Sequence, residues 1–215
     1  MTTLKTWTTR FALPALLCVA AASAQAVPVL SNLPGVDSGA GTNLGLGVDG
    51  ADRTKGVGMT MGASSLTFQS MSALIANITN ASTLSGGIFS SVGGNPGVQL
   101  AAFTPQAIAA TFPASVVTLT TASSFVLQAN TAYWFVLDGP TTENSLSWNS
   151  LAPNVAPSAS GGVTYNGYRF SSDGGTTWGV SGVSNGVTIS VVPETSTVLM
   201  LALGLGVIGL QLRRR

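Results

Sequence analysis

Turn-forming residues interrupt this chain so often between residues 27 and 191 that only short regular elements fit between them. Of 215 residues, 26 are glycine and 10 are proline. The clearest break is Gly-Gly-Asn-Pro-Gly at 93–97, which separates the apolar segments 88–92 and 98–103. Glycine and asparagine tolerate positive φ angles and proline fixes φ, so such clusters form turns. This spacing favours short strands over long helices.

The segments between the turns mostly alternate apolar with polar residues, which predicts strands with one buried face. Segment 132–137 is bulky on both faces and therefore predicts a central strand buried from two sides. Segment 74–80 also fits two turns of helix over 71–81, but its neighbours favour a strand. The fold class expected from about ten such segments is an all-β antiparallel β-sandwich of jelly-roll type. The remaining expected strands are 57–61, 66–68, 88–92, 98–103, 116–120, 123–127, 145–149, 165–170 and 187–192.

The first 26 residues have the organisation of a secretory signal peptide. A basic start is followed by the apolar run 11–22 and then by Ala24-Gln25-Ala26, a small-residue cleavage site. Twelve apolar residues are too few for a helix that spans a bilayer, so cleavage is expected, with Val27 as the first mature residue. We expect this segment to be helical before it is removed.

The last 24 residues form a second signal. Residues 197–212 carry no charge and would make a helix roughly 24 Å long at about 1.5 Å per residue. That length approaches the roughly 30 Å hydrocarbon core of a bilayer, so a transmembrane helix is expected. The basic end favours a cytoplasmic C-terminus. The flanking residues are Val192, Pro193, Glu194, Thr195 and Ser196 before the helix, and Arg213, Arg214 and Arg215 after it.

This three-part order resembles the PEP-CTERM protein-sorting tail of Gram-negative bacteria, with Thr195 where the family usually has a second proline. The resemblance implies processing near the motif by an exosortase, a membrane protease-transpeptidase. It also implies a location: exported, anchored in the inner membrane by the C-terminal helix before processing, then at the cell surface or in the extracellular matrix. The chain is thus expected to divide into a signal peptide (1–26), an extracellular domain (27–191) and a sorting tail (192–215).

The central domain carries three further motifs in a fixed order. They are Gly-Asn-Pro-Gly at 94–97, Leu-x-Ala-x-Thr-x-Tyr-Trp at 127–134, and Ser-Asp-Gly-Gly at 172–175 leading to Trp178. In this order they are similar to the choice-of-anchor R class of bacterial surface domains, over about residues 43–191. The resemblance implies an all-β extracellular domain with no established catalytic residues.

The composition of residues 27–191 excludes several classes of function. The segment has three basic and six acidic side chains, a net charge of −3, so no basic patch is available for nucleic acid. Histidine is absent and the single cysteine, Cys18, lies in the signal peptide. Ser-His-Asp and Cys-His catalysis and the common zinc sites are therefore excluded. We expect no cofactor, no metal and no enzymatic activity.

The few charged residues of this domain favour structural roles. Lys55 is its only lysine and belongs to the polar segment 49–56, an expected loop, which disfavours a Ser-Lys dyad. Asp49 and Asp52 of that loop are potential Ca²⁺ ligands, but their spacing matches no EF-hand. Ser171-x-Asp173-x-Gly175-x-Thr177-Trp178 matches the Asp-box of sialidase-like proteins, and a single copy indicates a hairpin turn capped by Asp173.

Three hypotheses of function follow. The leading one is a non-enzymatic surface or matrix protein. The alternative is a carbohydrate-binding module of the exopolysaccharide matrix, in which Trp148 and Tyr168 are the best exposed candidates for stacking on sugars. The least favoured is a secreted hydrolase, which requires two of the six acids to converge about 5 to 10 Å apart in a cleft.

Overall fold

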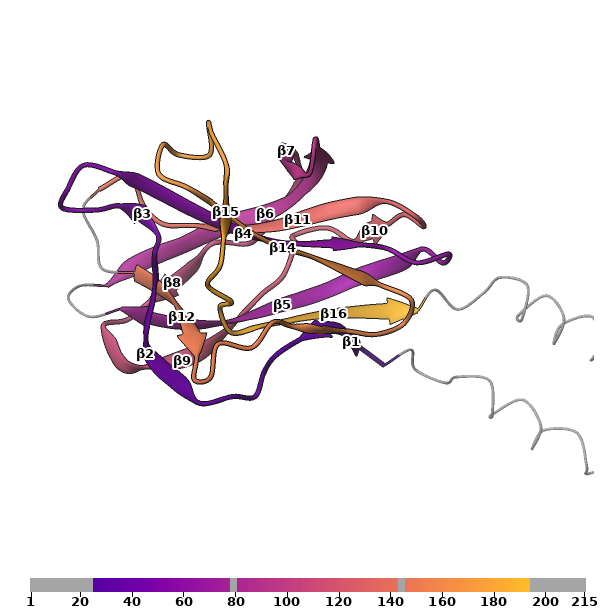
Figure 1. Ribbon diagram of the computed structural model, residues 1–215, viewed down its shortest axis with the longest axis horizontal. Helices are drawn as coiled ribbons and strands as arrows, with labels where there is room; N and C mark the ends of the chain where they lie inside the picture. The colour runs from indigo at the N-terminus through magenta and orange to yellow at the C-terminus, as the bar shows by residue number, and fades with distance from the viewer. Residues whose placement is uncertain (1–24, 78–80, 143–145, 194–215) are drawn as a thin grey trace, which may run out of the picture.

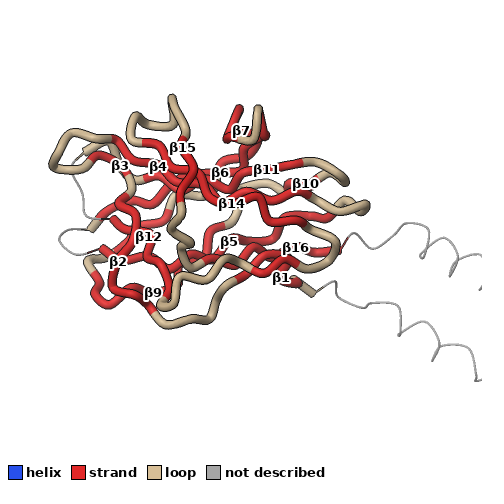
Figure 2. Tube along the Cα trace, in the orientation of Figure 1, coloured by secondary structure: helices blue, strands red, loops and turns tan. Residues whose placement is uncertain are grey.

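A computed structural model describes residues 25–77, 81–142 and 146–193. All regular structure in these ranges is β-strand, arranged as two antiparallel sheets that face each other (Figures 1 and 2). The all-β prediction and the two-sheet architecture are confirmed. The helices expected for the signal peptide and the sorting tail lie outside the described residues. Within the described ranges, no helix long and apolar enough to cross a membrane is present.

The first sheet is built around the longest strand, β5, which pairs with β16 and β12 along one edge and with β9 and β10 along the other. The outer strands are β1 and β13 beyond β16, and β2 beyond β12. The strands are β1 (Val27–Ser31), β2 (Asp37–Asn43), β5 (Leu66–Asn77), β9 (Thr111–Leu119), β10 (Phe125–Leu127), β12 (Leu146–Leu151), β13 (Ser158–Ala159) and β16 (Val187–Pro193).

The second sheet has the order β15-β14-β4-β11-β6-β7, with β3 beside β4 and β8 beside β6. β11 pairs with β4 and β6, and residues 133–137 are all buried. This confirms the predicted central strand. The strands are β3 (Gly45–Leu46), β4 (Asp52–Thr60), β6 (Ser82–Val92), β7 (Asn95–Ala102), β8 (Gln106–Ile108), β11 (Ala132–Asp138), β14 (Thr164–Ser171) and β15 (Gly179–Ser181).

Trp148 and Tyr168 lie in the core between the sheets, so the expectation that they are exposed is wrong. Their exposed fractions are 0% and 1%, and their rings pack edge to face with centroids 5.6 Å apart. The polar tip of each ring donates to a backbone carbonyl: Trp148 Nε1 to Gly186 O at 2.8 Å, and Tyr168 Oη to Asn185 O at 2.6 Å. Because these bonds replace those to water, both rings are buried without an unsatisfied donor.

The loop expected at 49–56 ends early, because β4 begins at Asp52. β4 is flanked on both sides, and both ladders reach Thr54, which lies opposite Asp138 of β11 and Ser171 of β14. Pairing on two edges therefore extends the strand through a charged segment whose composition favours a loop. The strand expected over the ambiguous segment is confirmed as far as Asn77, within β5, and the helical alternative is wrong there.

The first and last strands of the domain are neighbours. β1 pairs antiparallel with β16, and Val27 lies opposite Val191. The N-terminal end of β1 and the C-terminal end of β16 consequently lie at the same end of the sandwich (Figure 1). β16 continues through Val192 and Pro193, which pair with Thr67 and Leu66 of β5. The first two residues of the expected sorting motif thus belong to the sheet.

Candidate functional site

The outer face of the second sheet, which points away from the core, carries the candidate site. Side chains alternate along β11, and Tyr133, Phe135 and Leu137 belong to the core between the sheets. Trp134, Val136 and Asp138 therefore face outward. The same face holds the residues that pair with Asp138 on either side, which are Thr54 in β4 and Ser85 in β6.

A groove of about 350 Å³ lies on this face, between the Asp-box turn and the segment that runs from β7 to β8. It falls within the size range of small-molecule sites. Its lining combines three aromatic rings with a carboxylate, hydroxyls and an amide. The lining residues are Thr54, Ser85, Gly86, Phe89, Gly97, Gln99, Ala102, Phe103, Pro105, Val136, Asp138, Gly174, Gly175 and Trp178.

Asp138 is the only acid among the described residues that line the groove. One carboxylate oxygen, Oδ1, accepts a hydrogen bond from the Gly139 amide at 2.9 Å, and no described residue donates to the other. Burial raises the pKa of Asp138 to about 6; the Gly139 amide opposes this shift and the charge of Asp52 adds to it. The groove thus holds a partly desolvated carboxylate with one oxygen to which no described residue donates.

Thr54 lies beside Asp138 at the base of the groove and is only 3% exposed. Its hydroxyl is buried and has no hydrogen-bond partner among the described residues. A Cβ placed on Gly175 would lie 3.7 Å from Thr54 Oγ1, so the Asp-box turn covers this hydroxyl closely. Buried hydroxyls are normally paired, and Thr54 is therefore an exception that needs an explanation.

The Asp-box forms the hairpin turn that the sequence predicts. Asp173 Oδ1 accepts from the Thr177 amide at 2.9 Å and from Ser171 Oγ at 2.7 Å, while Thr177 Oγ1 donates to Asp173 Oδ2 at 2.7 Å. The bonds from Ser171 and Thr177 lower the pKa of Asp173 to about 2. Gly174 and Gly175 take positive φ angles of 66° and 86°. All these contacts lie within the turn, so the Asp173 carboxylate serves to hold its shape.

Trp178, at the end of the Asp-box turn, lines the groove. It is half-buried, and a Cβ on Gly175 would lie 3.4 Å from its Cζ2 atom, which places the ring against the turn. The turn is docked on the sheet because the Gly174 amide donates to Asp52 O at 2.9 Å. The ring therefore packs on a turn that is itself bonded to β4.

Trp134 lies on the same outer face but is covered. Its exposed fraction is 1%, its ring packs across Gly58, and the Arg169 guanidinium lies 5.2 Å from the ring centroid. Arg169 Nε also donates to Asn95 Oδ1 at 2.8 Å. The arginine is thus committed to Trp134 and Asn95, and it does not line the groove.

Lys55 faces the opposite side of the sheet and is completely buried. Its Nζ donates to Thr42 Oγ1 and to Val183 O, both at 2.9 Å, and lies 5.2 Å from the centroid of the Tyr168 ring. Burial lowers the pKa of Lys55 to about 7. The expectation that Lys55 belongs to a polar loop is therefore wrong.

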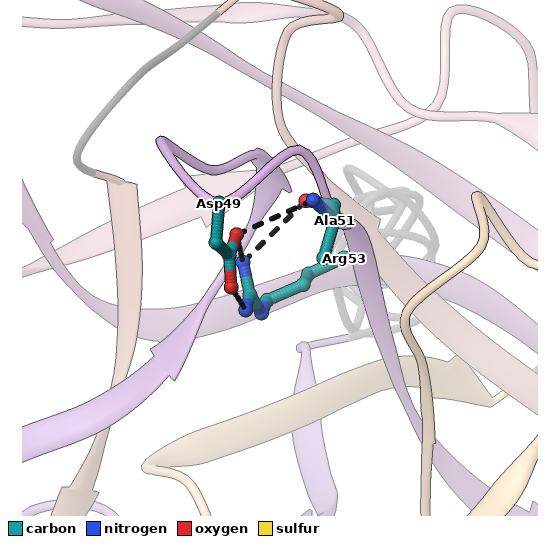
Figure 3. Close-up of polar contacts among 3 residues, drawn as sticks. All are labelled: Asp49, Ala51 and Arg53. Carbon is teal, nitrogen blue, oxygen red and sulfur yellow. Dashed lines mark hydrogen bonds and ion pairs between the residues drawn. The ribbon is translucent and has the colours of Figure 1, made fainter.

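An ion pair at the surface joins Asp49, in the loop before β4, to Arg53 at the start of that strand (Figure 3). Arg53 holds Asp49 with both terminal nitrogens, Nη1 to Oδ1 at 2.8 Å and Nη2 to Oδ2, and the Ala51 amide donates to Oδ1 at 3.3 Å. These bonds hold the pKa of Asp49 well below its usual range. Asp49 is thereby neutralised, and the described ranges contain no group of three acids, histidines or cysteines for a metal ion.

A second hollow, of about 470 Å³, lies beside this ion pair. Arg53 is the only charged residue among its described lining residues, and Asp49 already neutralises it. The other lining residues are Gly41, Thr42, Asn43, Phe170, Val180, Ser181 and Gly182. This hollow is larger than the groove, but its one described charged residue is already neutralised.

The residues of the expected signals are mostly beyond the described ranges. Ala26 is exposed and directly precedes β1, and Val192 and Pro193 end β16. The remaining ones lie outside: Ala24, Glu194, Thr195, Ser196, Arg213, Arg214 and Arg215. Sequence reasoning missed the groove itself, although Asp138 ends the most apolar strand of the domain and Trp178 closes the Asp-box, which are the two signals that point to it.

No family model, curated protein or solved structure matches this chain.

Proposed function

We propose that the protein is an exported bacterial surface or extracellular-matrix protein of non-enzymatic type, sorted through the tail 192–215 and processed there by an exosortase. The signal peptide and the membrane segment 197–212 act as helices in this scheme, and the sandwich 27–191 is of jelly-roll type. The exported domain is held at the inner membrane by its tail until the exosortase acts.

The observation that carries this proposal is the pairing of β1 with β16. β1 begins at Val27, the residue that follows the expected cleavage site, so removing residues 1–26 leaves the strand whole. Val27 lies opposite Val191, directly before the sorting motif. A domain with both ends together can be tethered through either one without disturbing the opposite end of the sandwich.

The test is mass spectrometry of the mature termini after cell fractionation, in strains with and without the exosortase. We expect an N-terminus at Val27 in both strains, and loss of Arg213, Arg214 and Arg215 only where the exosortase is active. An intact Arg215 on the surface protein of an exosortase-positive strain would overturn the proposal.

Two variants sharpen this test. Glu194→Gln should leave the protein unprocessed in the membrane fraction, whereas Glu143→Gln, at the only other glutamate, should be processed normally. Thr195→Pro restores the family's second proline and should increase the processed fraction. Equal processing of all three variants would contradict a role for the motif.

The carbohydrate-binding alternative no longer rests on Trp148 and Tyr168, which are buried. The groove over Asp138 and Trp178 favours it at a different place. A hydrolase would need a second carboxylate facing Asp138 across the groove, and none of the other described acids lines it. We therefore keep binding, without catalysis, as the second candidate function.

A further inference from the structure

We propose that the groove on the outer face of the second sheet binds a neutral sugar residue of a polysaccharide. Trp178 supplies the stacking surface, Asp138 accepts hydrogen bonds from the sugar hydroxyls, and Thr54 lies beside Asp138 at the base of the groove. This inference deepens the second candidate function by naming its site and ligand class, and it does not depend on processing of the tail.

The aromatic side chains of the groove favour a flat ligand. Trp178 and Phe89 line the groove from different elements, and both are half-buried, so part of each ring remains accessible. The Asp-box bonds of Asp173 and the bond from the Gly174 amide to Asp52 O fix the turn that carries Trp178. A ring held in place beforehand loses little freedom when a flat ligand packs on it.

The polar side chains at the base of the groove favour a ligand with hydroxyl groups. Asp138 and Thr54 lie opposite each other in neighbouring strands, so their side chains project from the same face. In the described parts of the chain, one oxygen of Asp138 accepts no hydrogen bond and the Thr54 hydroxyl has no partner. A ligand with several adjacent hydroxyls matches this combination, because each hydroxyl can both donate and accept.

The charge of the groove favours neutral over anionic ligands among those that are rich in hydroxyls. No basic residue occurs among the described lining residues, and Asp138 is an acid. The nearest arginine on this face, Arg169, is occupied by Asn95 and Trp134. Phosphorylated and uronic acid ligands would therefore meet a carboxylate without a compensating cation. Neutral sugars avoid this repulsion.

The experiment is calorimetric titration of the full-length chain in a detergent that has no sugar headgroup. The neutral probes are mannan, dextran, xylan and the polysaccharide extracted from the strain that expresses the protein. Alginate is the anionic comparison, and oligomers of glucosamine are the cationic one. Thermal unfolding of every variant confirms that it is folded before it is titrated.

Two matched pairs of variants locate the binding. Trp178→Ala should weaken binding to a neutral polysaccharide about tenfold, the change expected when a stacked aromatic ring is lost. Phe112→Ala removes an aromatic ring that is 69% exposed elsewhere, and affinity should not change.

Asp138→Asn keeps the shape of the side chain and should weaken binding about tenfold. Asp49→Asn, the control at an exposed carboxylate, should bind like the parent.

The proposal fails if no neutral polysaccharide binds, or if Trp178→Ala and Asp138→Asn bind as tightly as their controls. Binding of alginate or glucosamine oligomers in preference to every neutral probe would overturn the assignment to neutral sugars. Normal sorting of a protein that binds no polysaccharide would refute this inference alone. Binding by a protein whose tail is never processed would refute the sorting proposal alone.

Discussion

Thr54 and Lys55 are consecutive residues of β4 whose side chains face opposite sides of the same sheet. Both are buried, with exposed fractions of 3% and 0%. Lys55 faces the interior, where Thr42 Oγ1 and Val183 O accept its hydrogen bonds. Thr54 faces the groove, where its hydroxyl has no partner within the described chain. Adjacent positions of one strand thus differ in whether the protein itself completes their hydrogen bonds.

This difference separates a buried polar group that is paired within the protein from one that is left unpaired beside the groove. A buried group that finds its partners inside the protein adds to the specificity of the fold, whereas an unpaired one lowers stability until something else pairs with it. Lys55 belongs to the first kind, although its charge still opposes burial. Thr54 and the Asp138 oxygen that has no described donor belong to the second. Substitutions at these positions should therefore have opposite effects on stability.

The largest expected effect is the pH dependence that Lys55 gives to folding. Its pKa is about 7 in the folded protein and 10.5 in its ordinary state, so between these values the unfolded chain binds more protons. The stabilising contribution of the neutral amine is complete above pH 10.5 and is lost as the pH falls through about 7. Unfolding free energy should rise by about 3 kcal/mol from pH 7 to pH 9.5.

Urea unfolding at several pH values measures this dependence. Lys55→Met retains the length of the side chain without a titrating group, and its stability should be nearly constant from pH 7 to pH 9.5. A parent protein with an equally flat profile would show that Lys55 is charged inside the core, contrary to the shift inferred from its burial.

The next effect comes from two threonines changed in the same way. Thr42→Val removes an acceptor of Lys55 and should lower the unfolding free energy at pH 7 by about 2 kcal/mol, as expected for a hydrogen bond to a charged group. Thr54→Val removes a buried hydroxyl that has no partner among the described residues, and it should raise the unfolding free energy by about 1 kcal/mol. Chemical denaturation of the two variants gives both values, and a loss of stability in Thr54→Val would contradict the comparison.

The parts of the fold that the sequence predicts are those that depend on local pattern. The central strand β11 is recognisable because its apolar run is continuous, and the Asp-box because its hydrogen bonds join residues within one short turn. In both cases the information lies within a few neighbouring residues. Local pattern therefore identifies elements and turns, but not the layers that they face.

The groove and the buried polar groups depend instead on pairing between distant segments. Composition favours a loop around Lys55, yet β11 and β14 together draw that segment into the sheet. Trp148 alternates with polar neighbours in a way that fits either face of a strand. Its burial depends on distant partners: the ring packs on Tyr168, and its Nε1 donates a hydrogen bond to Gly186 O, 38 residues away. Likewise, Asp138 and Trp178 lie far apart in the sequence, and only the order of strands brings them to one groove.

Asp138→Asn should raise the free energy of unfolding at pH 7 by about 1 kcal/mol, after allowance for solvent screening at the mouth of the groove. The pKa of Asp138 is raised from 3.8 to about 6 in the folded protein, so its contribution is complete below pH 3.8 and is lost as the pH rises through 6. The variant should therefore be more stable than the parent at pH 7 and similar to it at pH 3.5. Unfolding at both pH values tests this, and an equal difference at both would exclude titration of Asp138 as its cause.

The smallest expected effect concerns the ion pair of Asp49 and Arg53, a polar contact at the surface rather than inside the sandwich. Both partners remain accessible to water, with side-chain exposed fractions of 56% and 21%, so water replaces the contact when it is broken. Asp49→Asn should leave the midpoint of urea unfolding unchanged at moderate salt, where the charges are screened. A clear loss of stability would mean that the ion pair, in addition to the hydrogen bonds of β4 to β11 and β14, holds the start of β4 in place. The exposed ion pair would then also help to position Thr54 and Lys55, and exposed polar contacts could not be treated as energetically minor in this domain.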